Sequence, residues 1–380
     1  MDRTHNNENC WPTRRQELLL KASLLNGKEA LSAWEEWRSD VDIEQLDVAS
    51  HRLLPLLYRN LSTHGIEDPV MGKLKGIYLQ TWYNNHLMIH RASALLTDFS
   101  DAGIKTIVLK GVVLNLLYYK NFGLRPMGDI DVLVPTKEAH RAIDLLRESG
   151  WTSSYRFPER IVPVIHGADF VDATGKHHLD LHWHLLIECC QPDADDDFWD
   201  GAIPISIEKV KTYALNPADQ LLHTLVHGVK WSPVPPFRWI ADAIMIMNAS
   251  SAGVDWDRLV DQAERRRLIL PVRHGLRYLH DRFEAPVPAA VLLRLEEIPV
   301  SRAERVEFRY KTENHKRKPL GNIPILWFDS SRLSGEKNLF RKLARFFGYV
   351  KHFWDVEHVW QLPLQALSLG VSKVRSRLGC

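Results

Sequence analysis

Hydrophobic residues in the first part of the chain recur every three or four positions. From residue 14 to about residue 91, stretches such as HRLLPLLYRNL and the start of LKGIYLQTWYNNHLMIHRASALL place their apolar side chains on one side of a helix. The segment Thr63-His64-Gly65 interrupts this spacing with a short turn signal. The pattern therefore predicts an N-terminal helical region over residues 1–95.

After Asp101-Ala102-Gly103 the spacing changes, and strand and helix patterns alternate. The run IKTIVLKG is rich in β-branched residues and predicts a strand, and VVLNLLYYKNFG after it has helical periodicity. GDIDVLVP predicts a second strand, and residues 137–149 predict a helix that Pro135-Thr136 begins and Gly150 stops. The order of these elements is β-α-β-α.

Alternating hydrophobic positions continue beyond this unit. GWTSSYRF, ERIVPVI, ADFVDAT and HHLDLHWHL each predict a strand, with Ala173-Thr174-Gly175-Lys176 as a hairpin turn. The acidic stretch QPDADDDFWDGA ends this section, and helical patterns then dominate, beginning with Asn216-Pro217 as a cap and first-position pair. We therefore expect an α+β fold: a small mixed β-sheet core over residues 96–195, flanked by the N-terminal helical region and by a C-terminal helical region over residues 196–380.

Length and composition are those of an ordinary folded protein. The 380 residues exceed a typical single core, which predicts two or three packed units. Hydrophobic residues make up 45% and charged residues 25% of the chain, so neither disorder nor a fibrous class is indicated. The 49 Lys and Arg residues nearly balance the 47 Asp and Glu residues, so the molecule as a whole has no large positive field. Nucleic acid is therefore not an expected partner.

Cysteine usage and the start of the chain bear on the cellular compartment. The four cysteines show no CxxC spacing, and the adjacent pair Cys189 and Cys190 rarely closes on itself, so reduced thiols are the simpler interpretation. The start MDRTHNNENCWPTRR is polar, and the longest apolar runs are shorter than a membrane span. We expect neither a signal peptide nor a transmembrane segment. We therefore expect the protein to be cytoplasmic.

Two carboxylates in the second strand indicate a metal site. Because side chains alternate along a strand, Asp129 and Asp131 project together while Ile130 and Val132 face the core. Their α-carbons are expected about 6.5 Å apart, a spacing from which both carboxylates converge on a hard cation. A divalent-metal site is the natural use of this pair.

The later strand HHLDLHWHL adds a third carboxylate. The same alternation places His178, Asp180, His182 and His184 on one face. Two carboxylates on one strand and one on its neighbour form the pocket expected for two-metal phosphoryl chemistry, in which Asp180 also accepts the proton of the attacking hydroxyl. Zinc is not favoured for the histidines, because no further ligand completes a tetrahedral set.

A phosphate site is expected at the first strand-to-helix turn. Lys110-Gly111 lies where the backbone amides and the dipole of a helix N-terminus favour an anion. Gly111 permits close approach of the backbone, and Lys110 adds positive charge.

Together these motifs resemble a known superfamily. LKGVVLNLLYYKNFGLRPMGDIDVLVP followed by HLDLHW is similar to the nucleotidyltransferase-fold superfamily related to DNA polymerase β, and specifically to a poorly characterised bacterial group with a KG…R…DID…DLHW signature. In the superfamily a Gly-Gly or Gly-Ser turn precedes a D-x-D strand and a later strand supplies a third Asp. Gly111, Asp129, Asp131 and Asp180 match these places.

One departure and the extent of the resemblance qualify this match. Lys110-Gly111-Val112 stands where Gly-Ser is usual, so a hydroxyl expected near the terminal phosphates is missing. The resemblance extends through VASHRLLPLLYRNL and LLHTLVHGVKW…FRWIADAIMIM, roughly two thirds of the chain, with strong motifs in the centre.

The resemblance implies a metal-dependent nucleotidyltransferase whose core is residues 96–195. It would transfer a nucleoside monophosphate from a nucleoside triphosphate such as ATP to a hydroxyl or phosphate of an unknown acceptor, a small molecule, peptide or protein. Asp129, Asp131 and Asp180 would be catalytic and hold Mg²⁺, with Mn²⁺ as the alternative ion, while Lys110 and the Gly111 amide steady the triphosphate. Two alternatives stay open: another transfer by the same fold, on a phosphorylated peptide or sugar, and a non-catalytic module that binds a nucleotide or a partner.

Two polar residues near the motifs have open roles. Arg125 is expected either to hold a phosphate or to fix its loop by pairing with a local carboxylate, and both interpretations stand. His182 is expected to orient Asp180 or to touch substrate.

The helical segments after residue 216 supply further candidates. Asp219, His223 and His227 follow one helix face, where we expect packing for Asp219 and leave nucleotide contact open for His227. Arg238 and Asp242 are four residues apart, which favours an intrahelical ion pair over substrate contact.

Two tryptophans and two basic stretches in the C-terminal half have more than one possible role. Trp231 and Trp239 are expected to pack in the interior, although either could stack a base. RVEFRYKTENHKRKP and RKLARFFGYVKHFWDVEHVW are locally basic, and solvated helix faces explain them more simply than an anionic acceptor, nucleic acid or a membrane surface.

Overall fold

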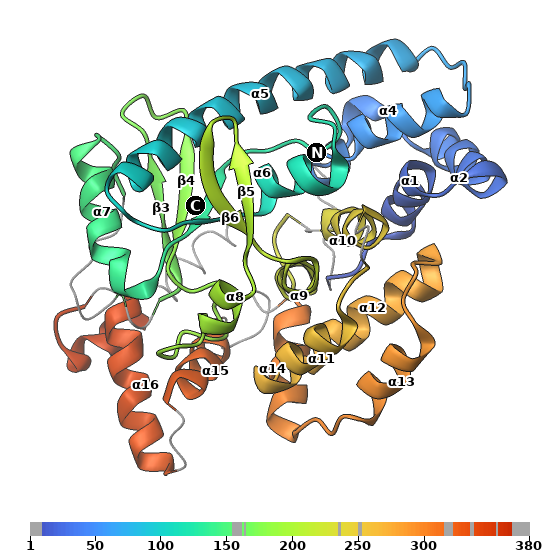
Figure 1. Cartoon of the computed structure of the whole chain (residues 1–380). Coiled ribbons are helices and arrows are strands. Elements are labelled where there is room, and N and C mark those ends of the chain that lie inside the picture. The colour runs from blue at the N-terminus through green and yellow to red at the C-terminus, as the bar shows by residue number, and fades with distance from the viewer. Residues whose placement is uncertain are drawn as a thin grey trace.

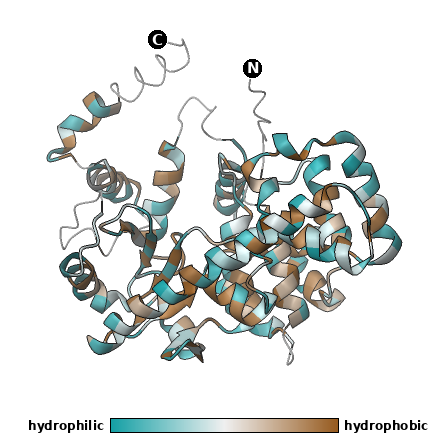
Figure 2. Ribbon diagram, turned by 90° about the horizontal axis from the view of Figure 1, so that it is seen from above, coloured by the Kyte–Doolittle hydropathy of each residue, from teal (hydrophilic) through white to brown (hydrophobic). Residues whose placement is uncertain are grey.

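The computed structural model has the α+β architecture expected from the sequence. A six-stranded mixed sheet lies at the centre, and the long helix α5 runs across the top of the view in Figure 1. Figure 2 shows hydrophobic residues gathered in the middle of the body and hydrophilic residues over much of its outside. The structure describes residues 10–153, 162, 165–234, 237–249, 253–314, 322–334, 338–354 and 356–366.

The N-terminal part is helical, as the hydrophobic spacing predicts. Thr13 and Gln16 form a capping box at the first helix, in which each side chain accepts a hydrogen bond from the other's backbone amide. The last helix passes the expected boundary at residue 95, because its buried residues continue to Phe99. The helices are α1 (Arg14–Leu24), α2 (Gly27–Asp40), α3 (Val48–His51), α4 (Leu54–Thr63) and α5 (Met71–Asp101), with a 3₁₀ turn at Ile43–Gln45.

The sheet combines strands from the expected core with a later hairpin. Its spatial order is β3-β4-β2-β1-β6-β5, in which β4 and β2 run parallel, as do β1 and β6, and the other neighbours are antiparallel. Residues 173–176 join β3 to β4, as the hairpin signal predicts. The strands are β1 (Ile107–Leu109), β2 (Ile130–Leu133), β3 (Gly167–Val171), β4 (His178–His182), β5 (Ile203–Ile207) and β6 (Val210–Ala214).

The β5–β6 hairpin differs from the sequence expectation. The helical patterns predict helices over residues 196–380, but the structure places two strands within residues 203–214, and β6 pairs with β1. Each strand is only five residues long, and Glu208 takes a φ of +50° at the turn between them. So short an alternation is easily overlooked beside longer helical patterns. The sheet therefore runs past residue 195, and the division of the chain into three regions remains a prediction.

The helix after β2 ends as expected but begins differently. Gly150 follows it with a φ of +82°, a conformation that glycine adopts without the steric cost of a Cβ. At its start, however, a 3₁₀ turn over Thr136–Glu138 comes first, and the Thr136 hydroxyl donates to the Trp183 carbonyl at 2.7 Å. This contact ties the helix start to the residue after β4, and neither the 3₁₀ turn nor α7 has a side-chain cap.

Later helices cover the side of the sheet where the candidate site lies. Asn216 caps α9 by accepting hydrogen bonds from the backbone amides of Ala218 and Asp219, and Pro217 occupies the first turn, as expected. Helix α9 packs against α10, α11 and α12. The remaining helices are α6 (Lys110–Val113) with its continuation η2 (Leu114–Tyr119), α7 (Ala139–Glu148), α8 (Asp196–Asp200), α9 (Pro217–Gly228), α10 (Arg238–Ala249), α11 (Trp256–Arg265), α12 (Ile269–Phe283), α13 (Ala289–Glu297), α14 (Arg302–Thr312), α15 (Ile323–Ser334), α16 (Leu339–Phe353) and η6 (Val359–Gln361).

One hydrophobic core unites most of the chain. Buried side chains form a contiguous cluster that extends from Cys10 to Val300. The two or three packed units expected from length therefore share a core. A small second cluster around Leu326, Val350 and Leu362 lies in the C-terminal helices.

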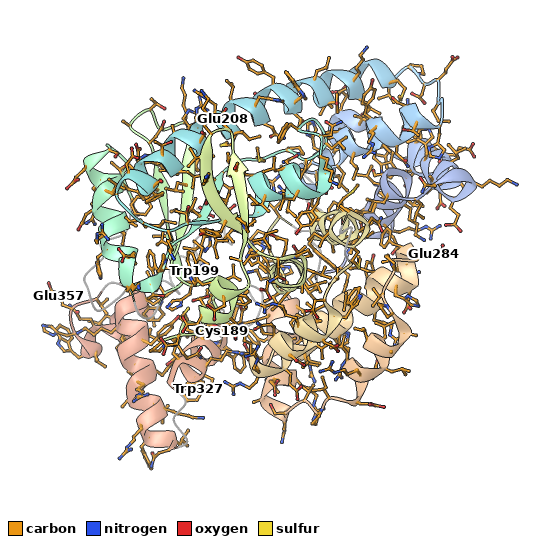
Figure 3. All side chains as sticks on the ribbon, viewed as in Figure 1. Cys189, Trp199, Glu208, Glu284, Trp327 and Glu357 are labelled. Carbon is orange, nitrogen blue, oxygen red and sulfur yellow. The ribbon has the colours of Figure 1, made fainter. Side chains whose placement is uncertain are left out.

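The cysteines agree with reduced thiols. Cys10, Cys189 and Cys190 are free and buried, and Figure 3 labels Cys189 among the side chains of the body. Within the described residues, no helix combines the length and the hydrophobicity of a membrane span.

Two sequence expectations fall partly outside the described residues. Thr152, in the segment GWTSSYRF, forms a single bridge with Val171, but residues 154–161, 163 and 164 lie outside, and these include most of ERIVPVI. The basic stretch RVEFRYKTENHKRKP begins in α14, and its last residues, 315–319, lie outside.

Candidate active site

Two parallel strands bring the second and third carboxylates together. β2 pairs with β4 so that Asp131 lies directly opposite Asp180. Lateral partners in a sheet project to the same face, so both carboxylates stand on one side. The Lys110 ammonium lies beside both, 2.5 Å from Asp131 Oδ1 and 3.9 Å from Asp180 Oδ2. The alternation in each strand predicts which residues share a face, and the pairing register sets them side by side.

His182 forms a compact group with these two carboxylates. Its side chain is buried, and its Nε2 lies 3.5 Å from Asp131 Oδ1. Neither ring nitrogen has a hydrogen-bond partner in the part of the chain that the structure describes. The ligand atoms of Asp131, Asp180 and His182 all lie within 4.8 Å of one another. The sequence predicts that His182 orients Asp180 or touches substrate. Its position with Asp131 and Asp180 also suits a metal ligand.

Asp129 stands next to this group without joining it. It lies just before β2, is half-buried and lines the cavity beside Asp131. Burial and the neighbouring Asp131 charge raise the pKa of its carboxyl. Among the described residues, the compact ligand group consists of Asp131, Asp180 and His182, so Asp129 is an outer member of the expected carboxylate set.

The two paired carboxyls have opposite pKa shifts. Burial favours the neutral form of Asp131, but the Lys110 ammonium and His182 outweigh it and hold the pKa of Asp131 well below its ordinary value. Burial and the Asp131 charge instead raise the pKa of Asp180 to about 8. Asp131 is therefore charged at neutral pH, while Asp180 can gain or release a proton there.

A strained turn places Lys110 against these carboxylates. Its φ of +43° lies in the left-handed region, which costs a residue with a Cβ about 1–2 kcal/mol. Burial opposes the charged ammonium, but Asp131 outweighs burial and raises the pKa of Lys110. The ion pair with Asp131 thus helps to hold the unfavourable backbone conformation.

Gly111 follows at a crowded point of the same turn. A Cβ at this position would lie 3.0 Å from Met127 Cγ and 3.5 Å from Arg125 Nη1. A larger residue would therefore press against the Met127 side chain. This crowding gives the glycine a packing reason in addition to the expected approach of a phosphate.

A cavity of about 220 Å³ opens beside the carboxylates. It lies between the β1–α6 turn and the start of β2 on one side and α9 and α10 on the other, and α3 adds to its rim. Its lining residues are Ala49, Arg52, Lys110, Gly111, Leu114, Arg125, Met127, Asp129, Asp131, Gln220, His223, Thr224, His227, Gly228, Arg238, Trp239 and Asp242.

Arg125 is already paired within the wall of this cavity. Its Nε lies 2.7 Å from Asp242 Oδ1 and its Nη2 lies 3.0 Å from Asp242 Oδ2, and the Tyr119 hydroxyl also donates to Oδ1. Of the two roles open to Arg125, the carboxylate pair is the one present. Arg238 donates to the Pro126 carbonyl at 2.9 Å, so the expected intrahelical pair with Asp242 is replaced by a pair between distant segments.

Helix α9 carries the predicted polar stripe to the cavity. Asp219 is packed as expected, and Arg258 donates to it at 2.7 Å. His223 is buried and His227 is exposed on the cavity wall. Burial lowers the pKa of His223 to about 3, and the charge of the nearby Lys230 lowers the pKa of His227. Both imidazoles are therefore neutral hydrogen-bonding groups at pH 7.

Of the two tryptophans, Trp239 is buried as the packing interpretation expects. Trp239 is buried, covers Gly228 closely and borders the cavity, while Trp231 is half-buried. The Nε1 of Trp239 has no hydrogen-bond partner among the described residues.

Sequence reasoning missed three residues around the site. Asp169 lies opposite Asp180 on β3, so Asp131, Asp180 and Asp169 form a row across three strands. The alternation in ADFVDAT contains the signal for Asp169. Arg52 and Gln220 reach the cavity from helices whose local pattern carries no chemical motif, so only the tertiary structure identifies them.

The donor set fits a divalent cation. Carboxylate oxygens suit hard cations, and a buried imidazole with two unpartnered nitrogens is neutral and free to ligate, since burial lowers the pKa of His182. Asp131 and Asp180 with His182 are the closest ligands, and Asp129 adds a carboxylate from the same strand end.

Comparisons with known proteins support a nucleotidyltransferase assignment. No curated protein matches the chain. A crystal structure of an antigenic nucleotidyltransferase-like protein from Paracoccidioides brasiliensis aligns with 15% identity over 54% of this chain and 96% of that chain, with a TM-score of 0.38. A family described as uncharacterised nucleotidyltransferase matches residues 46–284. Since this match covers more than half of its 380 residues, the chain belongs to that nucleotidyltransferase family.

Proposed function

We propose that the protein transfers a nucleoside monophosphate from a nucleoside triphosphate to an acceptor hydroxyl or phosphate, with Mg²⁺ or Mn²⁺ as the metal. The observation that carries this proposal is the pairing of Asp131 with Asp180 across parallel strands, with His182 and Lys110 at the same point. Such a group is costly to assemble for stability alone, because a half-buried carboxylate repels the buried one beside it.

The chemistry is attack of an acceptor oxygen on the α-phosphorus. A new P–O bond forms, the bond to the β-phosphate oxygen breaks, and pyrophosphate leaves. Asp131, Asp180 and His182, with Asp129 beside them, would hold a divalent ion, which would supply charge neutralisation at the reacting phosphate. Asp180 would receive the proton of an acceptor hydroxyl.

Other residues bind and orient the nucleotide in this proposal. Lys110 offers its ammonium, and the Gly111 amide lies next to it at the cavity wall. His227 offers a neutral imidazole on the opposite helix. Arg125 shapes the wall of the cavity through its two hydrogen bonds with Asp242.

The test compares binding and turnover in matched variants. Calorimetric titration with Mg²⁺ and ATP is expected to give at least tenfold weaker binding for Asp131→Asn than for the wild type, because the substitution removes a charged metal ligand. Asp144→Asn, an exposed aspartate of α7, serves as control and should bind as the wild type does. Equal binding by Asp131→Asn and the wild type would exclude the metal site.

Product analysis separates the proposal from its alternatives. Mass spectrometry after incubation with each nucleoside triphosphate and Mg²⁺ should detect pyrophosphate and a nucleoside monophosphate adduct once an acceptor is supplied. Transfer of a different group to a phosphorylated peptide or sugar would show another mass. Metal-dependent nucleotide binding with no turnover on any acceptor would support the non-catalytic module.

A further inference from the structure

Positive charge gathers on the helical side of the cavity. Arg52, at the end of α3, and Arg238, in the first turn of α10, both line it together with Arg125. Asp242 neutralises Arg125 through two hydrogen bonds. Arg52 and Arg238 also line the cavity, but the Asp242 carboxylate is already engaged by Arg125.

Arg238 is a cation in an unfavourable position. Its Nη1 donates to the neutral Pro126 carbonyl, and burial, then the charge of Arg125, lowers its pKa to about 10, with a further contribution from Arg52. In the part of the chain that the structure describes, neither Arg52 nor Arg238 has a carboxylate within the 4.0 Å of an ion pair. An anion between these two side chains would relieve their repulsion.

Neutral polar atoms in the same cavity also lack partners. Gln220 Oε1, His223 Nδ1 and Trp239 Nε1 belong to side chains that are more than nine-tenths buried, and none has a hydrogen-bond partner among the described residues. Buried polar groups are normally satisfied, so unsatisfied ones that line a cavity indicate a ligand with polar groups of its own.

We propose that Arg52 and Arg238 form a subsite for a phosphate group other than the one at which transfer occurs. The inference deepens the proposed function and rests on it for the position of the reacting phosphate. A planar guanidinium matches the oxygens of a phosphate, and two guanidiniums from different helices can contact one phosphate together. The phosphate belongs either to the terminal part of the nucleotide or to a phosphorylated acceptor. The N-terminal helices then take part in substrate binding, since Arg52 comes from them.

Pyrophosphate without metal is the direct probe of this subsite. Calorimetric titration should show about tenfold weaker binding to Arg52→Gln and to Arg238→Gln than to the wild type, since each loses a charged hydrogen-bond donor. Arg238→Lys keeps the charge and should retain more of the affinity, which separates a binding effect from misfolding. Arg59→Gln, exposed and outside the cavity lining, is the control and should bind as the wild type does. Unchanged binding in both Arg52→Gln and Arg238→Gln would overturn the subsite.

Nucleotides then identify the source of the phosphate. If it is the terminal part of the nucleotide, both glutamine variants should weaken Mg²⁺-ATP binding about tenfold and leave AMP binding unchanged. If the phosphate belongs to the acceptor, both glutamine variants should bind ATP and AMP as the wild type does. Pyrophosphate should then still bind to the ATP-loaded wild type, and it should bind more weakly to the ATP-loaded variants. Either result supports the subsite.

Asp131→Asn keeps the two proposals distinguishable. Weak Mg²⁺-ATP binding in Asp131→Asn together with normal pyrophosphate binding in the arginine variants would reject the subsite and leave the proposed function standing. Normal Mg²⁺-ATP binding in Asp131→Asn together with weak pyrophosphate binding in the arginine variants would reject the metal-dependent function and leave an anion site.

Discussion

Single charges at the site depend on one another. The buried Asp131 carboxylate is stabilised by the Lys110 ammonium at 2.5 Å, and Lys110 in turn holds a left-handed backbone conformation next to it. A buried carboxylate without a cation is strongly destabilising. In the metal-free protein the lysine therefore supplies the positive charge beside the candidate metal ligands Asp131 and Asp180.

Lys110→Met tests this dependence. The metal-free variant is expected to lose roughly 3 kcal/mol of unfolding free energy, because Asp131 is left buried without its cation. Added Mg²⁺ should raise the melting temperature of the variant more than that of the wild type, since the ion restores the missing charge. Lys105→Met, an exposed lysine just before β1, should behave as the wild type does in both measurements. An equal Mg²⁺ effect on Lys110→Met and the wild type would contradict the idea.

The elements were predictable where their local pattern is strong. Alternation identified β2 and β4, and with them the shared face of Asp131 and Asp180, because a strand fixes the direction of each side chain. The pair of Arg125 with Asp242 and the position of Arg52 were not predictable, since both depend on how distant helices pack. The β5–β6 hairpin was missed because its strands are short and pair with β1 only in the folded sheet.

The packing of α9 against α10 gives a prediction at this scale. A Cβ on Gly228 would fall well inside van der Waals contact of the Trp239 ring, which borders the cavity. Gly228→Ala should therefore lower the unfolding free energy by roughly 1–3 kcal/mol in urea titrations, through overpacking. Gly76→Ala in α5 is the matched control: a Cβ there meets nothing within 4 Å, so the same substitution should be neutral or stabilising by about 0.5–1 kcal/mol. Equal effects of the two substitutions would contradict the packing argument.

At the scale of the whole molecule, the C-terminal helices join the core through buried charges. Lys311 of α14 lies 3.1 Å from Glu188, which follows β4, and 3.2 Å from Asp329 of α15. Arg332 of α15 binds Glu307 and donates to the backbone carbonyl of Arg266 at 2.9 Å. These helices lie beyond the family match, which ends at residue 284. Ionic contacts therefore attach α14 and α15, which lie outside the family match, to the segment that follows β4, the strand that carries Asp180.

This attachment should weaken in acid. Burial disfavours the Glu188 carboxylate, but Lys311 outweighs burial and lowers the pKa of Glu188 to about 2, from an ordinary value of 4.5. A lowered pKa in the folded protein gives stability that is present above pH 4.5 and is lost as the pH falls from 4.5 toward 2. Urea titrations from pH 7 to pH 3 should therefore show a smaller acid-induced loss of unfolding free energy for Glu188→Gln than for the wild type, by an amount on the order of 1–3 kcal/mol.

The variant should also start from a lower stability at pH 7, because Lys311 then has one carboxylate fewer. Glu296→Gln is the control: its exposed ion pair with Arg277 is open to solvent and should leave the pH dependence unchanged. If Glu188→Gln and the wild type lost stability in parallel from pH 7 to pH 3, the Glu188–Lys311 contact would not be what couples the C-terminal helices to pH. Exchange of backbone amides in α14 and α15 at pH 4 would show whether these helices separate from the core before the sheet unfolds, as a contact carried by charge requires.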